Sequence, residues 1–415
     1  MDNLQSLARK TTGVLFTQHS LASAASVAAA TLNSIVGKEL SHQAGWAGAP
    51  TAVYLLGGAL AALGWGYVFD AVGRRDGLVM GLILGSIGSG MAFMAAVNSS
   101  FALFLAGLAL MGVAAAAVQL SRFAAAEVNL PGNRARAISN VVMGGTIGSV
   151  VGPLISGPAG NLAKFLVGND MAGAYLIGIV LYAIAALVVF IGLRPDPREI
   201  GRRVAEKFPE TVAGLDVARG VLVILRQPAA LVAVLSMVLG QMVMWLLLAI
   251  TSLHMHDHHL DLTNISLVIS SHSFGMYAFS IVSGRLADRF GRGPVILFGS
   301  GMLFLSCIAV TLSPDVWPLG IGLFLLGLGW NFCYVAGSAL LSDQLSPAER
   351  ARTQSVNDLL VGLAAAAGSL GSGVIFATFG FNAVGYISAA FSVIPFAAAL
   401  IWMQGRMGGK QMVAE

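Results

Sequence analysis

Long apolar runs separated by short polar segments are the feature that most constrains this chain. Each run is long enough for a membrane-crossing helix, which needs about 20 apolar residues. Of the 415 residues, 57% are hydrophobic and 10% are charged. A soluble domain carries about 25% charged residues, so this composition cannot cover a soluble surface. We therefore expect an all-α membrane protein with twelve transmembrane helices, near residues 13–36, 48–69, 77–97, 101–125, 138–163, 172–193, 229–252, 264–284, 294–313, 317–341, 354–377 and 382–404.

The runs form two sets of six around a charged segment. We predict an N-terminal bundle over residues 1–193, a cytoplasmic linker over 194–228 and a C-terminal bundle over 229–415. In transporters built from two such halves, the solute site lies between them near the membrane midplane. If the N-terminus is cytoplasmic, Lys38 and Lys164 are the only two of the 23 Lys and Arg residues on the outer side. Because Lys and Arg concentrate on the cytoplasmic side, we expect both termini inside, in a bacterial inner membrane.

A short loop motif occurs once in each half. The first copy comprises Gly66, Asp70, Gly73 and Arg74, followed by Arg75, and the second comprises Gly284, Asp288, Gly291 and Arg292. A second pair of motifs begins at Glu127 and Asp343, each followed by Pro and two Arg at the same positions. The two copies of each motif keep the same internal spacing, which indicates an internal duplication.

These loops resemble the loop signature of the major facilitator superfamily, whose members are alternating-access transporters. The resemblance implies two pseudo-symmetric six-helix bundles and a cytoplasmic gate. Glycines allow a tight turn and close helix approach, and the Asp caps a helix or pairs with an Arg across the seam between the halves. Glu127 is the expected partner of Arg74 or Arg75, and Asp343 of Arg292. The alternative is a charge cluster that only anchors the topology.

The fifth apolar run carries regularly spaced glycines. The pattern comprises Gly144, Gly148, Gly152, Pro153 and Gly157. Residues four apart share one helix face, and small residues there let another helix approach closely. The pattern resembles a span-five motif of the superfamily that is often found in antiporters, although a packing face alone explains it equally well. Leu108 stands four residues before Gly112, where the family's drug exporters carry an Arg, and this departure disfavours proton-coupled efflux.

The seventh and eighth runs carry the most specific pattern. Met242, Met244 and Trp245 lie in span seven, His254, His256, His258 and His259 follow on the outer side, and span eight has His272 four residues before Met276. This arrangement resembles the branch of the superfamily that contains CcoA-like copper importers and RfnT-like riboflavin transporters. The copper members pair an M-x3-M motif in span seven with an H-x3-M motif in span eight. Here the second motif is kept, whereas Leu248 replaces the second Met of the first.

The chemistry of this pattern leaves two substrates open. His272 and Met276 lie one turn apart on a helix face, and imidazole with thioether suits Cu(I), so they and Met244 are candidate metal ligands. The histidines on the outer side would then collect the metal. Met is also an ordinary filler of apolar helices, and outer histidines can be merely solvated. An organic solute such as riboflavin is at least as well supported, with Trp245 and Trp330 available for stacking.

Polar side chains inside apolar runs mark further candidates, because burying them in lipid is costly. The predicted substrate-binding residues are Gln18, His19, Gln119, Arg122, Gln241, Met244, Trp245, His272, Met276, Asn331 and Tyr334. Asp358, near the inner end of span eleven, is grouped with the gate residues. It either carries a coupling proton or, as we prefer, neutralises an Arg of the loop motif.

Together these features predict a secondary transporter of a small solute, with uptake of a riboflavin-like compound or copper preferred. Proton-coupled multidrug efflux is the alternative. The sequence has no P-loop lysine motif and no enzyme signature, so we expect neither ATP-driven transport nor catalysis. We expect no cofactor other than transported Cu(I). The expected partners are a small-molecule or metal-ion substrate and the lipid bilayer, not nucleic acid, and the expected state is a monomer. The charged segment 194–226 mixes both signs and predicts amphipathic helices on the inner surface.

Overall fold

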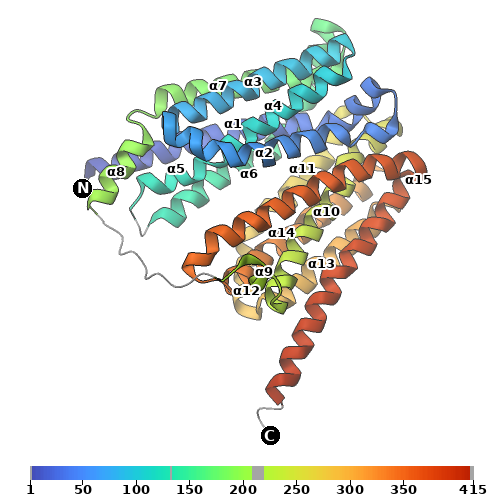
Figure 1. The fold of residues 1–415 in the computed structure, drawn as a ribbon. Coiled ribbons are helices and arrows are strands. Elements are labelled where there is room, and N and C mark those ends of the chain that lie inside the picture. The colour runs from blue at the N-terminus through green and yellow to red at the C-terminus, as the bar shows by residue number, and fades with distance from the viewer. Residues whose placement is uncertain (1, 131–132, 208–218, 412–415) are drawn as a thin grey trace. The chain divides into compact units, whose positions relative to one another are not determined.

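The computed structural model describes residues 2–130, 133–207 and 219–411, and within these ranges it is almost entirely helical (Figure 1). The chain divides into two compact units. Unit 1 comprises Met1–Val212 with Asp261–Ser270, and unit 2 comprises Ala213–Leu260 with Ser271–Glu415. The short segment 261–270 belongs to unit 1 because two of its serines bond to helix α6 (Arg134–Val167). Ser266 Oγ lies 2.9 Å from Ser156 Oγ, and Ser270 Oγ donates to the carbonyl oxygen of Val150 at 3.0 Å.

Each unit is a bundle of long helices. Unit 1 contains α1 (Asp2–Ser41), α2 (Ala49–Val72), α3 (Arg74–Asn98), α4 (Phe101–Gln119), α5 (Ser121–Val128), α6 (Arg134–Val167), α7 (Gly173–Gly192) and α8 (Pro197–Lys207), with two 3₁₀ turns at Ala44–Trp46 and Asp170–Ala172. Unit 2 contains α9 (Val221–Leu225), α10 (Pro228–Asp257), the part of α11 (Leu262–Ala278) that starts at Ser271, α12 (Ser280–Phe290), α13 (Arg292–Ala309), α14 (Val316–Ser342) and α15 (Pro347–Gln411).

The helix lengths and apolarity agree with a membrane-spanning protein. Nine helices among the described residues can each cross a bilayer, and two bent pairs raise this number to eleven. One of the nine is the 54-residue stretch 352–405 of α15. A straight helix of that length would extend about 80 Å, far more than the ~30 Å apolar core. Gly380, at φ 80° and ψ 177°, breaks it into two helices, so the total is consistent with the twelve expected crossings.

Two predicted boundaries differ from the structure. Helix α4 ends at Gln119, and after a break at Leu120 the chain continues as α5, which carries Arg122 and Glu127, so that the fourth candidate span, Phe101–Val128, consists of two helices. Helix α10 continues to Asp257, so His254 and His256 lie on its last turn and not in a loop as expected. An apolar run shows which part of a helix is surrounded by lipid. Whether the helix continues into the polar residues at its ends depends on local hydrogen bonding, and the apolar pattern gives no information about that.

The first part of the charged segment after α7 forms an amphipathic helix, α8, whereas residues 208–218 of the same predicted segment lie outside the described residues. On α8, Ile200 and Val204 are fully buried, and Ile200 packs against Ala8 and Val128. Arg202 on the same helix is exposed. Burial of one apolar stripe and exposure of a charged face is the pattern of a helix that lies on a bundle. This helix therefore belongs to unit 1 and covers the start of α1 and the end of α5.

Glycines bring α1 and α6 into backbone contact. A Cβ at Gly144 would lie 2.5 Å from the carbonyl oxygen of Phe16, and one at Gly152 would lie 2.5 Å from that of Ala24. A Cβ at Gly148 would collide with the carbonyl oxygen of Ser20. These three glycines thus form one stripe against α1. The last glycine of the pattern, Gly157, instead faces Thr263 at ordinary contact distance, and Pro153 lies inside α6 between the two sets.

We expect Gly148→Ala to lower the apparent melting temperature of the purified protein, because the added methyl must push two helix backbones apart. Overpacking of this kind costs roughly 1–3 kcal/mol. Gly64→Ala is the matched control, since a Cβ there has no heavy atom within 4 Å and alanine favours helix. Equal melting temperatures for wild type and Gly148→Ala would show that the two helices do not pack as described.

Candidate functional site

The two loop motifs make the same backbone turn in the two units. Gly73 joins α2 to α3 at φ 94° and ψ 169°, and Gly291 joins α12 to α13 at φ 91° and ψ 160°. Residues with a side chain rarely adopt this positive-φ conformation, so both positions require glycine. The predicted duplication is thus present in the backbone. The other glycines of the motif behave differently, because a Cβ at Gly66 or Gly284 would have no heavy atom within 4 Å. The close approach expected at these two positions is not seen among the described residues.

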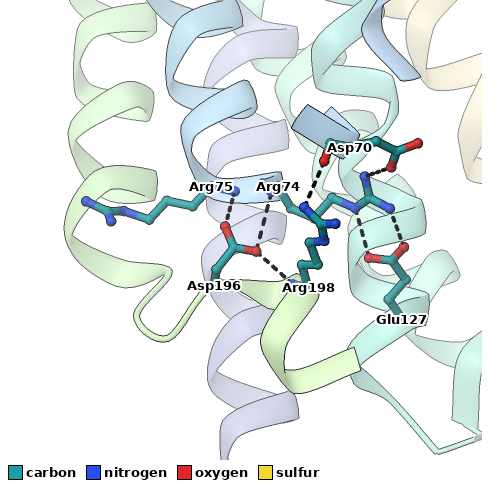
Figure 2. A network of polar contacts seen from close by, with 6 residues as sticks. All are labelled: Asp70, Arg74, Arg75, Glu127, Asp196 and Arg198. Carbon is teal, nitrogen blue, oxygen red and sulfur yellow. Dashed lines mark hydrogen bonds and ion pairs between the residues drawn. The ribbon is translucent and has the colours of Figure 1, made fainter. Parts of the chain in front are cut away.

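In unit 1 the turn directs Arg74 between two carboxylates (Figure 2). Its Nε and Nη2 donate to the two carboxylate oxygens of Glu127 at 3.0 and 2.7 Å, and Nη1 donates to Asp70 at 2.8 Å. Paired parallel hydrogen bonds between guanidinium and carboxylate are the strongest geometry for such pairs. The partner that the sequence predicts for Glu127 is therefore Arg74. Arg75 lies over the ring of Phe190 instead, 4.6 Å from its centroid.

Unit 2 repeats this ion pair in a weaker form. Arg292 donates through Nη1 to Asp288 at 2.7 Å and through Nε to Asp343 at 3.2 Å. Asp343 therefore accepts a single bond, whereas Glu127 accepts two. Among the described residues each of these pairs lies within its own unit, and the pairing of a motif Asp across the seam between the halves stays a prediction.

Asp196, just after α7, closes the unit 1 cluster, and the sequence did not single it out. Its carboxylate accepts from the backbone N–H groups of Arg75 at 2.9 Å and Arg198 at 2.7 Å, and more distantly from Arg74 at 3.4 Å (Figure 2). The first N–H groups of a helix have no partner within it, so this carboxylate caps α3. Because a Cβ at Gly73 would lie 2.9 Å from Asp196, the same glycine also makes room for the cap. The start of the linker is thus fixed to unit 1.

Glu349 and Arg219 form a second contact that the sequence did not reveal. Glu349, near the start of α15, has a side chain only 3% exposed. Arg219 donates to it through Nε at 2.7 Å, Nη2 at 2.8 Å and its backbone N–H at 2.9 Å. The backbone of Ser346 donates a further bond at 3.0 Å. The Arg219 guanidinium and these N–H groups hold the pKa of Glu349 well below its usual range. The end of the linker is thus fixed to unit 2.

The predicted substrate residues of unit 2 meet on α10 and α14. Trp330 Nε1 donates to Gln241 Oε1 at 2.6 Å, and the rings of Trp330 and Tyr334 stack with centroids 4.9 Å apart. All three side chains are partly exposed. Trp245 lies one turn beyond Gln241, and its indole N–H has no hydrogen-bond partner among the described residues. Asn331 faces elsewhere, donating to the carbonyl of Met276 at 2.6 Å and to Ser280 at 2.8 Å.

His272 is held against α14. Its Nδ1 lies 3.0 Å from the carbonyl oxygen of Leu323, which can only accept, so Nδ1 carries the proton. Its Nε2 is buried and has no partner among the described residues, which leaves an imidazole lone pair available. Met276 follows one turn later and is partly exposed, and Met244 is buried on α10. Of the three candidate metal ligands, His272, Met276 and Met244, the structure thus shows one whose ligating atom, Nε2 of His272, has its lone pair available.

The outer histidines do not form a metal cluster in the described part of the chain. The ring of His254 stacks flat on that of Phe381, with the ring centroids 3.9 Å apart, and it contacts the ring of His258 edge-on, with the centroids 4.4 Å apart. His258 also bonds to the carbonyl oxygen of His254. No group of three His, Cys, Asp or Glu side chains within residues 2–130, 133–207 and 219–411 is arranged to hold a metal ion. The structure thus shows two of these rings, those of His254 and His258, in contact with one another at the end of α10.

Of the predicted polar residues of unit 1, the structure brings His19 and Arg122 close enough to interact electrostatically. Gln18 is fully buried, and neither atom of its amide has a partner among the described residues. His19 Nδ1 lies 3.1 Å from Ser121 Oγ. The guanidinium carbon of Arg122 lies over the ring of Phe123, 4.9 Å from its centroid. Gln119 is exposed.

Asp358 of unit 2 is also exposed, and it accepts a hydrogen bond from Gln354 at 3.2 Å. The arginine partner preferred for Asp358 is not among the contacts that the structure gives.

Arg74→Lys is expected to destabilise the protein by about 1 kcal/mol, because Lys cannot form the paired bonds with Glu127 and the site is partly exposed to solvent. The matched control is Arg292→Lys, which loses a single bond to Asp343 and is expected to cost less. Thermal unfolding of both variants in the same detergent measures the difference. A larger loss for Arg292→Lys would contradict the ranking.

Glu349→Gln is expected to lower the melting temperature at pH 7, and the difference from wild type is expected to shrink in acid. Because folding depresses the pKa of Glu349, its stabilisation is complete above the unfolded value of about 4.3 and is lost as the pH falls through the folded value. Melting curves between pH 7 and pH 3 test this. Glu206→Gln, at an exposed pair with Arg202, serves as the control. A pH-independent difference for Glu349→Gln would contradict the assignment.

Comparison with known proteins agrees with this architecture. The Major Facilitator Superfamily model matches residues 14–255 and 233–410. The chain is 32% identical over 407 residues to YdeG of Bacillus subtilis, an uncharacterized MFS-type transporter, covering 97% of this chain and 94% of that protein. It is 28% identical over 357 residues to the riboflavin transporter RfnT of Brucella anthropi, covering 86% of each chain. A 92-residue segment is 34% identical to the multidrug resistance protein MdtL of Shigella flexneri, covering 22% of this chain and 24% of MdtL.

The solved structures agree in fold. A bacterial homologue of the human lysosomal transporter Spinster superposes with a TM-score of 0.72 at 16% sequence identity, covering 95% of this chain and 96% of the other. At that identity the likeness concerns the fold alone. The matching family model, the full-length relative and the duplicated loop motifs with their Gly73 and Gly291 turns lead to one conclusion: this chain belongs to the major facilitator superfamily and is a multi-pass membrane transporter, not an enzyme.

Proposed function

We propose that this protein is an alternating-access secondary transporter of the bacterial inner membrane that takes up a planar organic solute of the riboflavin type. It acts as a monomer with both termini in the cytoplasm. The observation that carries the proposal is the cluster of Gln241, Trp330 and Tyr334 on α10 and α14. The relation to RfnT along most of both chains supports the same substrate class.

The cluster suits a flat heteroaromatic ring. The bond to Gln241 fixes the indole plane of Trp330, and Tyr334 supports one of its faces. Both rings are partly exposed, so aromatic surface remains for a ligand. Offset stacking contributes about 0.5–1.5 kcal/mol beyond the burial of area. The indole N–H of Trp245, which is buried and has no hydrogen-bond partner among the described residues, is the candidate donor to the edge of the solute.

Trp330→Leu is expected to reduce riboflavin uptake about tenfold in cells that cannot make riboflavin, because it removes both the stacking surface and its anchor. Trp330→Phe keeps a ring without the bond to Gln241 and is expected to lose less. Trp317→Leu, at the exposed start of α14, controls for expression and folding. Riboflavin uptake by the Trp330→Leu cells at the wild-type rate, with equal protein in the membrane, would refute the substrate assignment.

Copper is the second candidate, and the free Nε2 of His272 favours it. An imidazole that donates one N–H to a carbonyl and keeps a lone pair on the other nitrogen has the usual arrangement of a metal-binding histidine. The same cells decide between the two solutes. Copper accumulation that depends on His272 and Met276, without riboflavin uptake, would favour the metal. Efflux has the least support, because the similarity to MdtL covers a short segment.

A further inference from the structure

A cavity of about 600 Å³ lies entirely within unit 1, between the beginnings of α1 and α6. Its lining combines two guanidinium groups, several side-chain amides and an apolar part. None of the described residues that line it is acidic, and neither Arg9 nor Arg136 has an ion-pair partner among the described residues. The described lining of the cavity therefore carries a net positive charge. It lies at the end of unit 1 that the Lys and Arg bias predicts to be cytoplasmic.

The glycine stripe fixes how the two helices present this lining. Phe16 lies against Gly144, Ser20 against Gly148 and Ala24 against Gly152, so α1 and α6 run parallel with a constant offset. Carried back towards the two N-termini, the same offset places Arg9 beside Ala137, one residue from Arg136. The backbone register thus puts the two arginines of the cavity level with one another.

The other lining residues follow the same two faces. Arg9 and Phe16 are seven residues apart on α1, and Arg136 and Met143 are seven residues apart on α6. Seven residues are about two helical turns, so the two members of each pair share one helix face and are separated by about 10 Å along the axis. Asn140 lies between the charged and apolar ends of its face. The cavity therefore changes from cationic at the helix beginnings to apolar further in, next to Phe16 and Met143.

The charge at the open end is reinforced by the backbone. Both helices begin there, so the positive ends of both helix dipoles point towards the same space. Asn133, the N-cap of α6, makes no side-chain capping bond, and it lines the cavity. Two guanidinium groups together with side-chain amides match the several oxygens of a phosphate better than any uncharged group.

We infer that this cavity binds a phosphate-bearing organic molecule from the cytoplasmic side, with its phosphate between Arg9 and Arg136 and its apolar part next to Phe16 and Met143. The ligand is either a soluble phosphate ester or the headgroup of a phospholipid. Because all the described residues that line the cavity belong to unit 1, the inference does not depend on the solute assigned to the cluster on α10 and α14.

The test measures binding to the purified full-length protein in nanodiscs of zwitterionic lipid. Riboflavin 5′-phosphate and uncharged riboflavin are the probes, since they differ by the phosphate group. We expect Arg9→Gln and Arg136→Gln each to weaken binding of the phosphate ester about tenfold or more, and to leave riboflavin unaffected. Lys10→Gln is the matched control, because it removes the same charge one residue along α1 at an exposed position that does not line the cavity.

Nanodiscs containing phosphatidylglycerol separate the two sources of phosphate. Co-purified phosphatidylglycerol that is lost in Arg9→Gln and Arg136→Gln but kept in Lys10→Gln would assign the cavity to a lipid headgroup. Binding of riboflavin 5′-phosphate in the presence of that lipid would assign it to a soluble ester. Equal weakening by Lys10→Gln, or no dependence on either arginine with both the ester and the lipid, would overturn the inference. Thermal unfolding without ligand confirms that each variant is folded.

Discussion

Backbone contact between α1 and α6 is the constraint from which the arrangement of unit 1 follows. Lipid chains are as apolar as helix side chains, so helices associate in a membrane through close packing and hydrogen bonds. Gly144, Gly148 and Gly152 allow that approach, and each meets the main chain of α1. Contact of this kind fixes the register of the two helices more strictly than flexible side chains would. The positions of all the side chains along both helices, including the arginines at their beginnings, are consequences of it.

Charged side chains near helix ends fix the two ends of the chain segment between the bundles. Asp196 caps α3 within unit 1, and Arg219 binds the buried Glu349 within unit 2. Each contact satisfies backbone N–H groups as well as charges, so breaking it would leave several donors without partners. The beginning and the end of the linker therefore belong to separate units.

The sequence predicted what is local or repeated. Apolar runs located the helices, the duplicated motif located the turns at Gly73 and Gly291, and opposite charges at helix ends indicated the pair of Arg74 and Glu127. Asp196 and Glu349 escaped notice because their partners lie more than a hundred residues away in the chain and are largely backbone N–H groups. A periodic pattern carries no information about such contacts. The last turn of α10 was misplaced for a related reason, since stacking of His254 on Phe381 is a tertiary interaction.

The placement of polar groups along the helices bears on the substrate. Gln241 lies near the middle of α10 and Trp330 near the middle of α14, so their cluster sits at the depth of the bilayer centre. Amide, indole and phenol groups there are uncharged, whereas the ion pairs of Arg74 and Arg292 lie at helix beginnings. A charged solute at that depth would need a compensating charge to offset its desolvation. Stacking surfaces and uncharged hydrogen-bonding groups match a neutral ring with polar edges, which gives a physical reason to prefer a flavin-like solute over a metal ion at this cluster.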